Sequence, residues 1–127
     1  MSTRKVDAFR ECLNMIDDYS ELREAVAKLC AQFPGTYWRE LDRDMAYPTD
    51  FVEALTKAGW LSVLIPEDYG GSGLPLSAAA VILEEMQARG CNGGACHAQM
   101  YTMGTLLRHG SAQQKQTYLP ALSLIHI

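Results

Sequence analysis

The clearest structural signal in the sequence is the segment Pro48-Thr49-Asp50-Phe51-Val52-Glu53-Ala54-Leu55-Thr56-Lys57-Ala58-Gly59-Trp60. Proline suits the first turn of a helix, and threonine can cap one. Phe51, Leu55 and Ala58 recur at helical spacing and predict the buried face. Gly59 stands where a helix end needs a left-handed backbone, and Trp60 can fold back to pack. The segment therefore predicts a helix that starts near Pro48 or Thr49 and ends at Gly59.

Another helix is expected before this segment. It opens at Asp18, with Glu21 three positions later as a capping-box-like pair, and Pro34 with Gly35 ends it. Its apolar stripe is Leu22, Val26, Leu29 and Phe33.

Three more helices are expected downstream. The first ends near Gly90, the second runs from about Gly94 to His109, and the third reaches about Tyr118 before Pro120. Gly110 stops the second of these, and Ser111 with Gln114 forms a capping box for the third. The apolar face of the first is Leu76, Ala79, Ala80, Leu83 and Met86.

One short apolar run, Leu61 to Pro66, is compatible with extended structure, and Tyr69 to Gly73 predicts a turn. No similar run follows that could pair with it. The sequence therefore predicts an all-α domain of five to six helices.

Length and composition narrow the functional classes. A chain of 127 residues corresponds to about one domain. Its net charge of −4 disfavours nucleic-acid binding, and its longest apolar run is far too short to span a bilayer. No apolar stretch follows the basic residues of the N-terminus, so a secretory signal is not expected. These features predict a soluble, cytoplasmic protein whose four cysteines are reduced and mostly buried: Cys12, Cys30, Cys91 and Cys96.

Three motifs resemble known chemical sites but lack the residues or the geometry that those sites require. Gly70-Gly71-Ser72-Gly73 lacks the lysine and hydroxyl of a phosphate loop and is better explained as a turn. Cys91 and Cys96 are separated by four residues, whereas haem attachment needs two, and no further zinc ligands lie nearby. Glu84 and Glu85 point about 100° apart on a helix, which favours a solvated face over an acid–base pair. No metal site and no catalytic residue is predicted.

The expected helix over Gly94–His109 carries two stripes. One stripe is typical of a helix face in the hydrophobic core and consists of Cys96, Met100, Met103 and Leu107. His97, Tyr101, Gly104 and Arg108 form a half-polar stripe with Gly93 and Gly94 one turn earlier. That stripe is explained equally well as the wall of a narrow pocket or as a packed helix with a satisfied histidine.

Four segments together resemble the N-terminal domain of the acyl-CoA dehydrogenase family. Ile65-Pro66-Glu67-Asp68-Tyr69-Gly70-Gly71-Ser72-Gly73 is similar to the family segment after the second helix. Phe51–Leu55 leading into Ala58–Leu61 precedes it, and Val81-Ile82-Leu83-Glu84-Glu85-Met86 follows. Gly110-Ser111-Ala112-Gln113-Gln114-Lys115-Gln116-Thr117-Tyr118-Leu119-Pro120 resembles the family motif close to the domain boundary.

The resemblance implies a reaction and an architecture. In this family a helical domain precedes a β-barrel and a second helical domain, and FAD lies between the latter two, often with a second subunit contributing. A glutamate removes the α-proton of an acyl-CoA thioester while a hydride passes to the flavin, and an electron-transfer flavoprotein usually accepts the electrons. The resemblance implies a homo-oligomeric parent enzyme, and places Gly94, His97 and Tyr101 at substrate-pocket positions. Acyl-CoA oxidases and flavin monooxygenases share this domain and remain alternatives, as does a stand-alone helical binding module.

The resemblance also suggests boundaries. Residues 1–14 are expected to be an extension and residues 15–121 the helical domain. Residues 122–127 match the translated end of a sequencing adapter, so we expect a non-native tail and a truncated gene. The catalytic base and most flavin contacts would then lie beyond the chain, which by itself would be inactive.

Overall fold

A computed structural model describes residues 19–122, and these residues form helices without any strand. The α-helices are α2 (Ser20–Cys30), α3 (Gly35–Asp44), α4 (Thr49–Ala58), α5 (Leu76–Ala88), α6 (Gly94–His109) and α7 (Ala112–Leu122). Two 3-10 turns, η1 (Trp60–Ser62) and η2 (Glu67–Tyr69), lie between α4 and α5. The predicted all-α class is confirmed.

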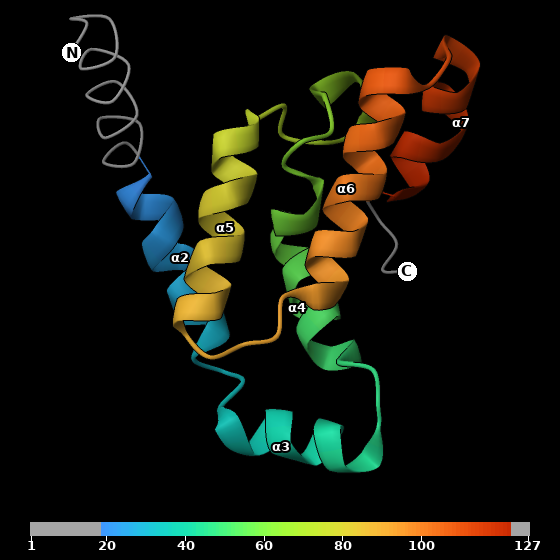
Figure 1. Cartoon of the computed structure of the whole chain (residues 1–127). Coiled ribbons are helices and arrows are strands. Elements are labelled where there is room, and N and C mark those ends of the chain that lie inside the picture. The colour runs from blue at the N-terminus through green and yellow to red at the C-terminus, as the bar shows by residue number, and fades with distance from the viewer. Residues whose placement is uncertain (1–18, 123–127) are drawn as a thin grey trace, which may run out of the picture.

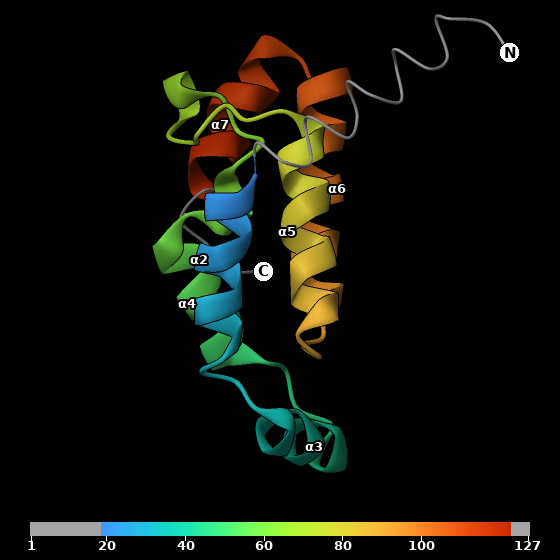
Figure 2. The same ribbon diagram turned by 90° about the vertical axis from the view of Figure 1, so that its left-hand side faces the viewer.

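Helices α2, α4, α5 and α6 run side by side, and α3 and α7 lie at opposite ends of this group (Figure 1). α2 packs on α5, α5 packs on α6, and α4 completes the group. α3 crosses one end of the bundle, while α7 packs against α6 at the opposite end, as the turned view also shows (Figure 2).

The core is apolar and lies between α2, α4, α5 and α6. Its fully buried side chains include Val26, Phe51, Leu55, Ile82, Met86 and Cys96. Burying one large apolar side chain contributes about 1.5–3 kcal/mol. A smaller cluster of Ile65, Met103 and Leu119 joins α7 to the bundle.

Helix α4 begins at Thr49 and ends at Gly59, as predicted, and Gly59 has a φ of 82°. Phe51 and Leu55 are fully buried, which confirms two positions of the predicted face. The assignment of Ala58 to the buried face is wrong, because Ala58 is exposed. Val52 is buried instead. The chain turns away after Ala58, so Trp60 and Leu61 provide the next contacts with the core.

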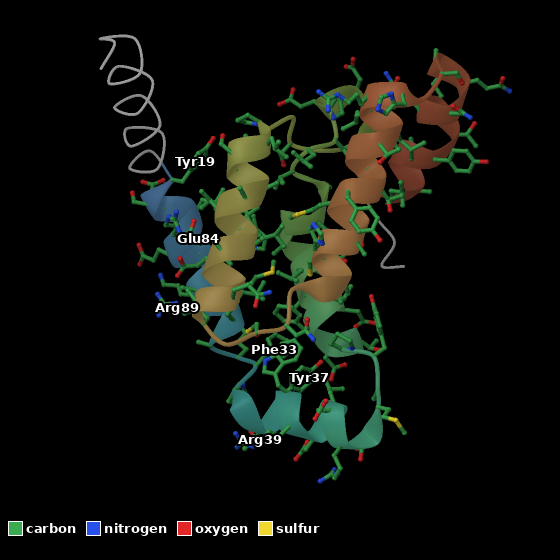
Figure 3. All side chains as sticks on the ribbon, viewed as in Figure 1. Tyr19, Phe33, Tyr37, Arg39, Glu84 and Arg89 are labelled. Atoms are coloured by element: carbon green, nitrogen blue, oxygen red, sulfur yellow. The ribbon has the colours of Figure 1, made fainter. Side chains whose placement is uncertain are left out.

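Helix α3 was not expected from the sequence, since Pro34 and Gly35 were interpreted only as the end of the preceding helix. No residue of α3 is fully buried. Its short apolar stripe of Tyr37, Trp38 and Leu41 is half-buried and was overlooked in the sequence. Aromatic rings attach it to the bundle: Phe33 meets Tyr37 and Phe51 edge to face, at centroid distances of 5.1 and 5.2 Å. Phe33 and Tyr37 lie at the junction of α3 with the bundle (Figure 3).

The run from Leu61 to Pro66 is not extended. It forms η1 and a turn. The chain then folds back on it, because Gly73 N donates to Ile65 O at 2.8 Å and Leu74 N donates to Val63 O at 2.7 Å. No pattern in the sequence indicated this pairing, which joins a turn to a glycine loop rather than two strands.

The remaining helices differ from expectation mainly at their ends. α2 ends at Cys30 rather than at Pro34, and its predicted capping residue Asp18 lies outside the described residues. In the next helix, α5, Leu76 is 74% exposed and Ala80 is exposed, so these two positions of its predicted face are wrong.

α6 matches the predicted range, and the capping box of α7 is confirmed. Ser111 N donates to Gln114 Oε1 at 2.9 Å, and Gln114 N donates to Ser111 Oγ at 3.1 Å. α7 continues through Pro120 to Leu122, contrary to the predicted stop. The buried Gln99 side chain donates from Nε2 to Leu122 O at 3.0 Å, which holds this last turn against α6.

Candidate functional site

The glycine loop at residues 70–73 uses its amides internally. Gly70 N donates to Glu67 O, Gly71 N to Pro66 O, and Ser72 N to Ser62 O, at 2.9–3.3 Å. Gly73 N is also bound, to Ile65 O. A phosphate-binding loop must aim free N–H groups at its ligand. The loop is therefore a structural turn, as expected, and not an anion site.

The two adjacent glutamates of α5 have different environments. The Glu84 side chain is 68% exposed, in line with a solvated face. The Glu85 side chain is only 11% exposed, so the prediction of a solvated face is wrong for this residue. Its carboxylate meets Arg23 at 3.4 Å and Arg89 at 3.0 Å. These arginines explain why a carboxylate is tolerated there, since buried charges are normally paired. The group ties α2 to α5 and is not an acid–base pair.

Three cysteines are buried and reduced, as predicted: Cys30, Cys91 and Cys96. Cys12, the fourth, lies outside the described residues. Burial raises the pKa of Cys96 to about 12, and burial together with the neighbouring Cys91 raises the pKa of Cys30 to about 12. Such thiols carry almost no nucleophilic thiolate at neutral pH. Within residues 19–122 no group of His, Cys, Asp and Glu side chains is arranged to hold a metal ion.

Helix α6 has one buried and one exposed stripe. Cys96, Met100 and Met103 are buried, and Leu107 packs partly buried at the second cluster, which confirms the predicted core stripe. The other stripe faces outward. His97 and Tyr101 are exposed there, and their rings meet edge to face at 5.3 Å. Gly94 is also exposed, and its N–H is capped by Asn92 Oδ1 at 2.9 Å.

Two surface hollows meet at Tyr101, whose side chain is 58% exposed. The larger, about 530 Å³, lies along the C-terminal half of α6 and is lined by Leu64, Leu76, Tyr101, Gly104, Thr105, Leu107, Arg108 and His109. The smaller, about 430 Å³, lies between α6 and α7 and is lined by Tyr101, Thr102, Thr105, Leu106, Tyr118 and Leu122. Tyr101 is therefore the one predicted pocket residue that borders both hollows, while Gly94 and His97 lie further along the same helix face.

Among the residues that line the larger hollow, only Tyr101 was a predicted pocket residue. Arg108 shares the stripe of Tyr101 at helical spacing, so the signal was present in the sequence. Leu76 was instead assigned to the core, because an isolated leucine at a helix start gives no indication that it faces out.

Comparison with known proteins identifies the domain. The family profile described as "Acyl-CoA dehydrogenase, N-terminal domain" matches residues 17–123. The chain belongs to the acyl-CoA dehydrogenase family. The outward stripe of α6 is thus a surface of an acyl-CoA dehydrogenase N-terminal domain, and the observed all-α architecture agrees with that assignment.

Curated relatives have the same family name. FadE25 of Mycobacterium tuberculosis, named a probable acyl-CoA dehydrogenase, is 31% identical over 109 residues, which are 84% of this chain and 28% of that protein. The acyl-CoA dehydrogenase FadE12 of the same organism is 28% identical over 108 residues, again covering 84% and 28%. The mitochondrial short-chain specific acyl-CoA dehydrogenase of Rattus norvegicus is 33% identical over 84 residues, covering 63% and 20%.

The chain therefore spans just over a quarter of the length of the mycobacterial relatives. No solved structure matches it significantly. None of the helices within residues 19–122 has the length and apolar character needed to cross a membrane.

Proposed function

We propose that the whole protein is a flavin-dependent acyl-CoA dehydrogenase that desaturates the α,β bond of an acyl-CoA thioester and passes a hydride to FAD. The observation that carries this proposal is the family match over residues 17–123, supported by relatives that are themselves named acyl-CoA dehydrogenases. Electron transfer to an electron-transfer flavoprotein, a homo-oligomeric assembly and a cytoplasmic location belong to the same proposal.

In this proposal the domain forms part of the wall around the acyl chain, through Gly94, His97 and Tyr101 on α6. Support comes from the exposure of this stripe beside two hollows, since a helix face that meets a ligand must not be covered by its own domain. The Tyr101 ring is large and rigid, so it can exclude water from the reacting carbons. The imidazole of His97 makes the wall more polar than an aliphatic tunnel.

The described residues do not fit a FAD site of their own. The glycine loop has no free amides, and the buried Glu85 is occupied by two arginines. We therefore assign the flavin contacts and the base that removes the α-proton to other parts of the whole protein, and expect no activity from this chain alone. No chemical step is assigned to residues 19–122.

The role of Tyr101 is tested in the full-length protein with saturated acyl-CoA substrates of graded chain length. Tyr101→Ala should shift the preferred chain length, because removing the ring enlarges the pocket wall. Tyr101→Phe is the matched control and should keep the wild-type preference. If the Ala variant has the wild-type profile of kcat/KM against chain length, Tyr101 does not line the acyl pocket.

The same assay separates the alternatives. An acyl-CoA oxidase would produce hydrogen peroxide with molecular oxygen as acceptor, and a flavin monooxygenase would require oxygen and a reduced nicotinamide. A stand-alone binding module would show no bound flavin at all.

A further inference from the structure

The loop that joins α5 to α6 contains the single Asn-Gly dipeptide of the chain, Asn92-Gly93. Asparagine reacts with its own backbone most readily before glycine, because glycine has no Cβ to hinder the approach of its nitrogen to the side-chain amide. The other asparagine of the chain, Asn14, precedes a methionine. Asn92 is exposed and lies outside the helices, so its side chain is open to water and its backbone is not held in helical geometry.

We propose that Asn92 is a site of spontaneous deamidation, in which the backbone nitrogen of Gly93 attacks the Asn92 side chain and the product alters the start of α6. This modification is separate from the proposed dehydrogenase reaction. It requires water and no enzyme or cofactor.

The reaction is an intramolecular substitution without a change of oxidation state. The Gly93 nitrogen loses its proton and forms a bond to Asn92 Cγ, while the bond from Cγ to Nδ2 breaks. Nδ2 leaves as ammonia and takes up that proton. Water then opens the cyclic imide at one of its two carbonyl carbons. Opening at Cγ gives aspartate, and opening at the backbone carbonyl gives isoaspartate, in which the main chain runs through the side-chain carbons.

The local geometry supports formation of the first bond. Asn92 Oδ1 accepts a hydrogen bond from Gly94 N at 2.9 Å, which is the side-chain turn typical of asparagine. This turn folds the side-chain amide back along the two residues that follow, so Cγ lies near the peptide nitrogen that must attack it. No backbone carbonyl within residues 19–122 accepts a hydrogen bond from Gly93 N, so no such bond opposes the attack.

The isoaspartate product would disturb the start of α6. It adds one backbone carbon between Cys91 and Gly93, and both of these residues are buried. The longer chain must therefore displace one of them. Gly93 directly precedes the first turn of α6, which carries Gly94 and His97. We expect this turn to loosen once Asn92 has reacted.

The hydrogen bond of Asn92 also has a simpler explanation. An asparagine close to a helix start satisfies one of the first N–H groups, and that role requires no reaction. In that case the hydrogen bond and the packing of Gly93 against α5 hold the side chain away from the attacking nitrogen. The two explanations differ in whether the folded protein converts Asn92.

The experiment incubates the full-length, folded protein at neutral and at mildly alkaline pH and follows the peptides that contain Asn92 and Asn14 by mass spectrometry. The Asn92 peptide should gain the mass difference between OH and NH2 and should separate into aspartate and isoaspartate forms. Its rate of conversion should rise with hydroxide concentration, because the Gly93 nitrogen must lose its proton. The Asn14 peptide is the internal control and should remain unchanged while the Asn92 peptide is lost.

Gly93→Ala is the matched variant. The added Cβ would lie 3.1 Å from Nε2 of Gln87, the far end of an exposed side chain that can move aside, so we expect this variant to fold. The Cβ should hinder the attack, and most of Asn92 should survive the incubation that converts the wild type. Hydrogen exchange in the first turn of α6 should become faster in the converted wild type and stay slow in the variant.

Two results would overturn the inference. If Asn92 in the folded protein is lost no faster than Asn14, the side chain is held as a helix cap and does not react. If Gly93→Ala converts as fast as the wild type, the Gly93 nitrogen is not the attacking group. Neither result bears on the proposed dehydrogenase activity, because the experiment measures peptide masses and not turnover.

Discussion

The carboxylate of Glu85 lies 3.4 Å from the guanidinium of Arg23, and this ion pair joins the neighbouring helices α5 and α2. Arg89 approaches the same carboxylate at 3.0 Å from one helical turn away. Glu84, the next residue, also meets Arg23, at 3.3 Å, but its side chain is largely exposed. Glu84 and Arg89 lie along the flank of α5 that faces α2 (Figure 3). Two neighbouring glutamates with one shared partner thus provide a natural comparison between a buried and an exposed ion pair.

Glu85→Gln should lower the free energy of unfolding by about 2 kcal/mol, because it removes a mostly buried charge that pairs with two arginines. Arg23 then keeps only the exposed Glu84 as a partner. Glu84→Gln should change it by less than about 0.5 kcal/mol, as is usual for exposed ion pairs. Urea unfolding of both variants measures the difference. Equal losses would show that burial does not strengthen the Glu85 contacts.

Position 71 requires glycine, because the backbone of Ile65 packs against it too closely for any side chain. A Cβ at this position would lie 2.0 Å from the carbonyl oxygen of Ile65, a backbone atom that cannot move aside without disturbing the turn. We expect Gly71→Ala to cost about 3 kcal/mol or more, as overpacking does at its upper range.

Gly104→Ala provides the control for that experiment, because a Cβ there meets no atom within 4 Å. In the interior of α6 alanine should stabilise the protein by about 0.5–1 kcal/mol. Thermal unfolding should move in opposite directions for the two variants. A neutral Gly71→Ala would mean that the loop does not approach Ile65 as closely as described.

The capping box of α7 should be worth a measurable amount of stability. Ser111→Ala removes the side-chain acceptor for Gln114 N and should cost about 1 kcal/mol. Since the two residues bond reciprocally, the double variant Ser111→Ala/Gln114→Ala should cost less than the two single losses added together. Strict additivity in a double-mutant cycle would argue against the reciprocal pair.

The buried thiols predict how stability depends on pH. A cysteine thiol ordinarily titrates near 9, while the pKa of Cys96 in the folded protein is raised to about 12 by burial. Between these values the unfolded chain loses the proton and the folded chain keeps it. The thiol therefore leaves stability unaffected below about pH 9 and lowers it as pH rises from 9 towards 12.

Urea unfolding at several pH values from 7 to 10.5 tests this slope. Tyrosines and lysines titrate in the same range, so the comparison is with Cys96→Ala, which should show a shallower decline above pH 9. Identical slopes in the two proteins would show that Cys96 is not shielded in the folded state.

Local signals in the sequence were sufficient where one residue type controls the backbone. Gly59 at the end of α4 and the reciprocal pair Ser111 and Gln114 are of this kind, and both were predicted correctly. The range of α6 was also correct, because its methionine stripe and Gly110 mark the helix and its end.

The errors have a common physical origin, which is that tertiary contacts decided them. α3 has no buried residue, and its position depends on rings from Phe33 and Phe51 that lie outside the helix. Glu85 is buried only because Arg23 reaches it from another helix. α7 passes Pro120 while Gln99, distant in sequence, binds the carbonyl of its last residue. Periodicity marks α3 itself, through Tyr37, Trp38 and Leu41, but it contains no information on the contacts that Arg23 and Gln99 make with other helices.

The candidate site was only partly accessible to sequence reasoning for the same reason. The stripe of Tyr101 could be recognised from helical spacing, and Tyr101 is exposed, while the pocket role of the stripe stays a prediction. The hollow beside it could not be recognised from the sequence. Two of its lining residues come from other segments: Leu64 from the turn after η1, and Leu76 from the start of α5. Its basic residues, Arg108 and His109, are neighbours on α6, so only the apolar part of the lining depends on the other segments.

The central claim is that this domain belongs to an enzyme that oxidises acyl-CoA thioesters with a bound flavin. The most direct test is to purify the full-length protein and add a saturated acyl-CoA under anaerobic conditions while recording the flavin spectrum. The account predicts that the protein contains FAD and that the absorbance of the oxidised flavin is lost as enoyl-CoA forms. A full-length protein without flavin, or a flavin that no acyl-CoA reduces, would contradict it.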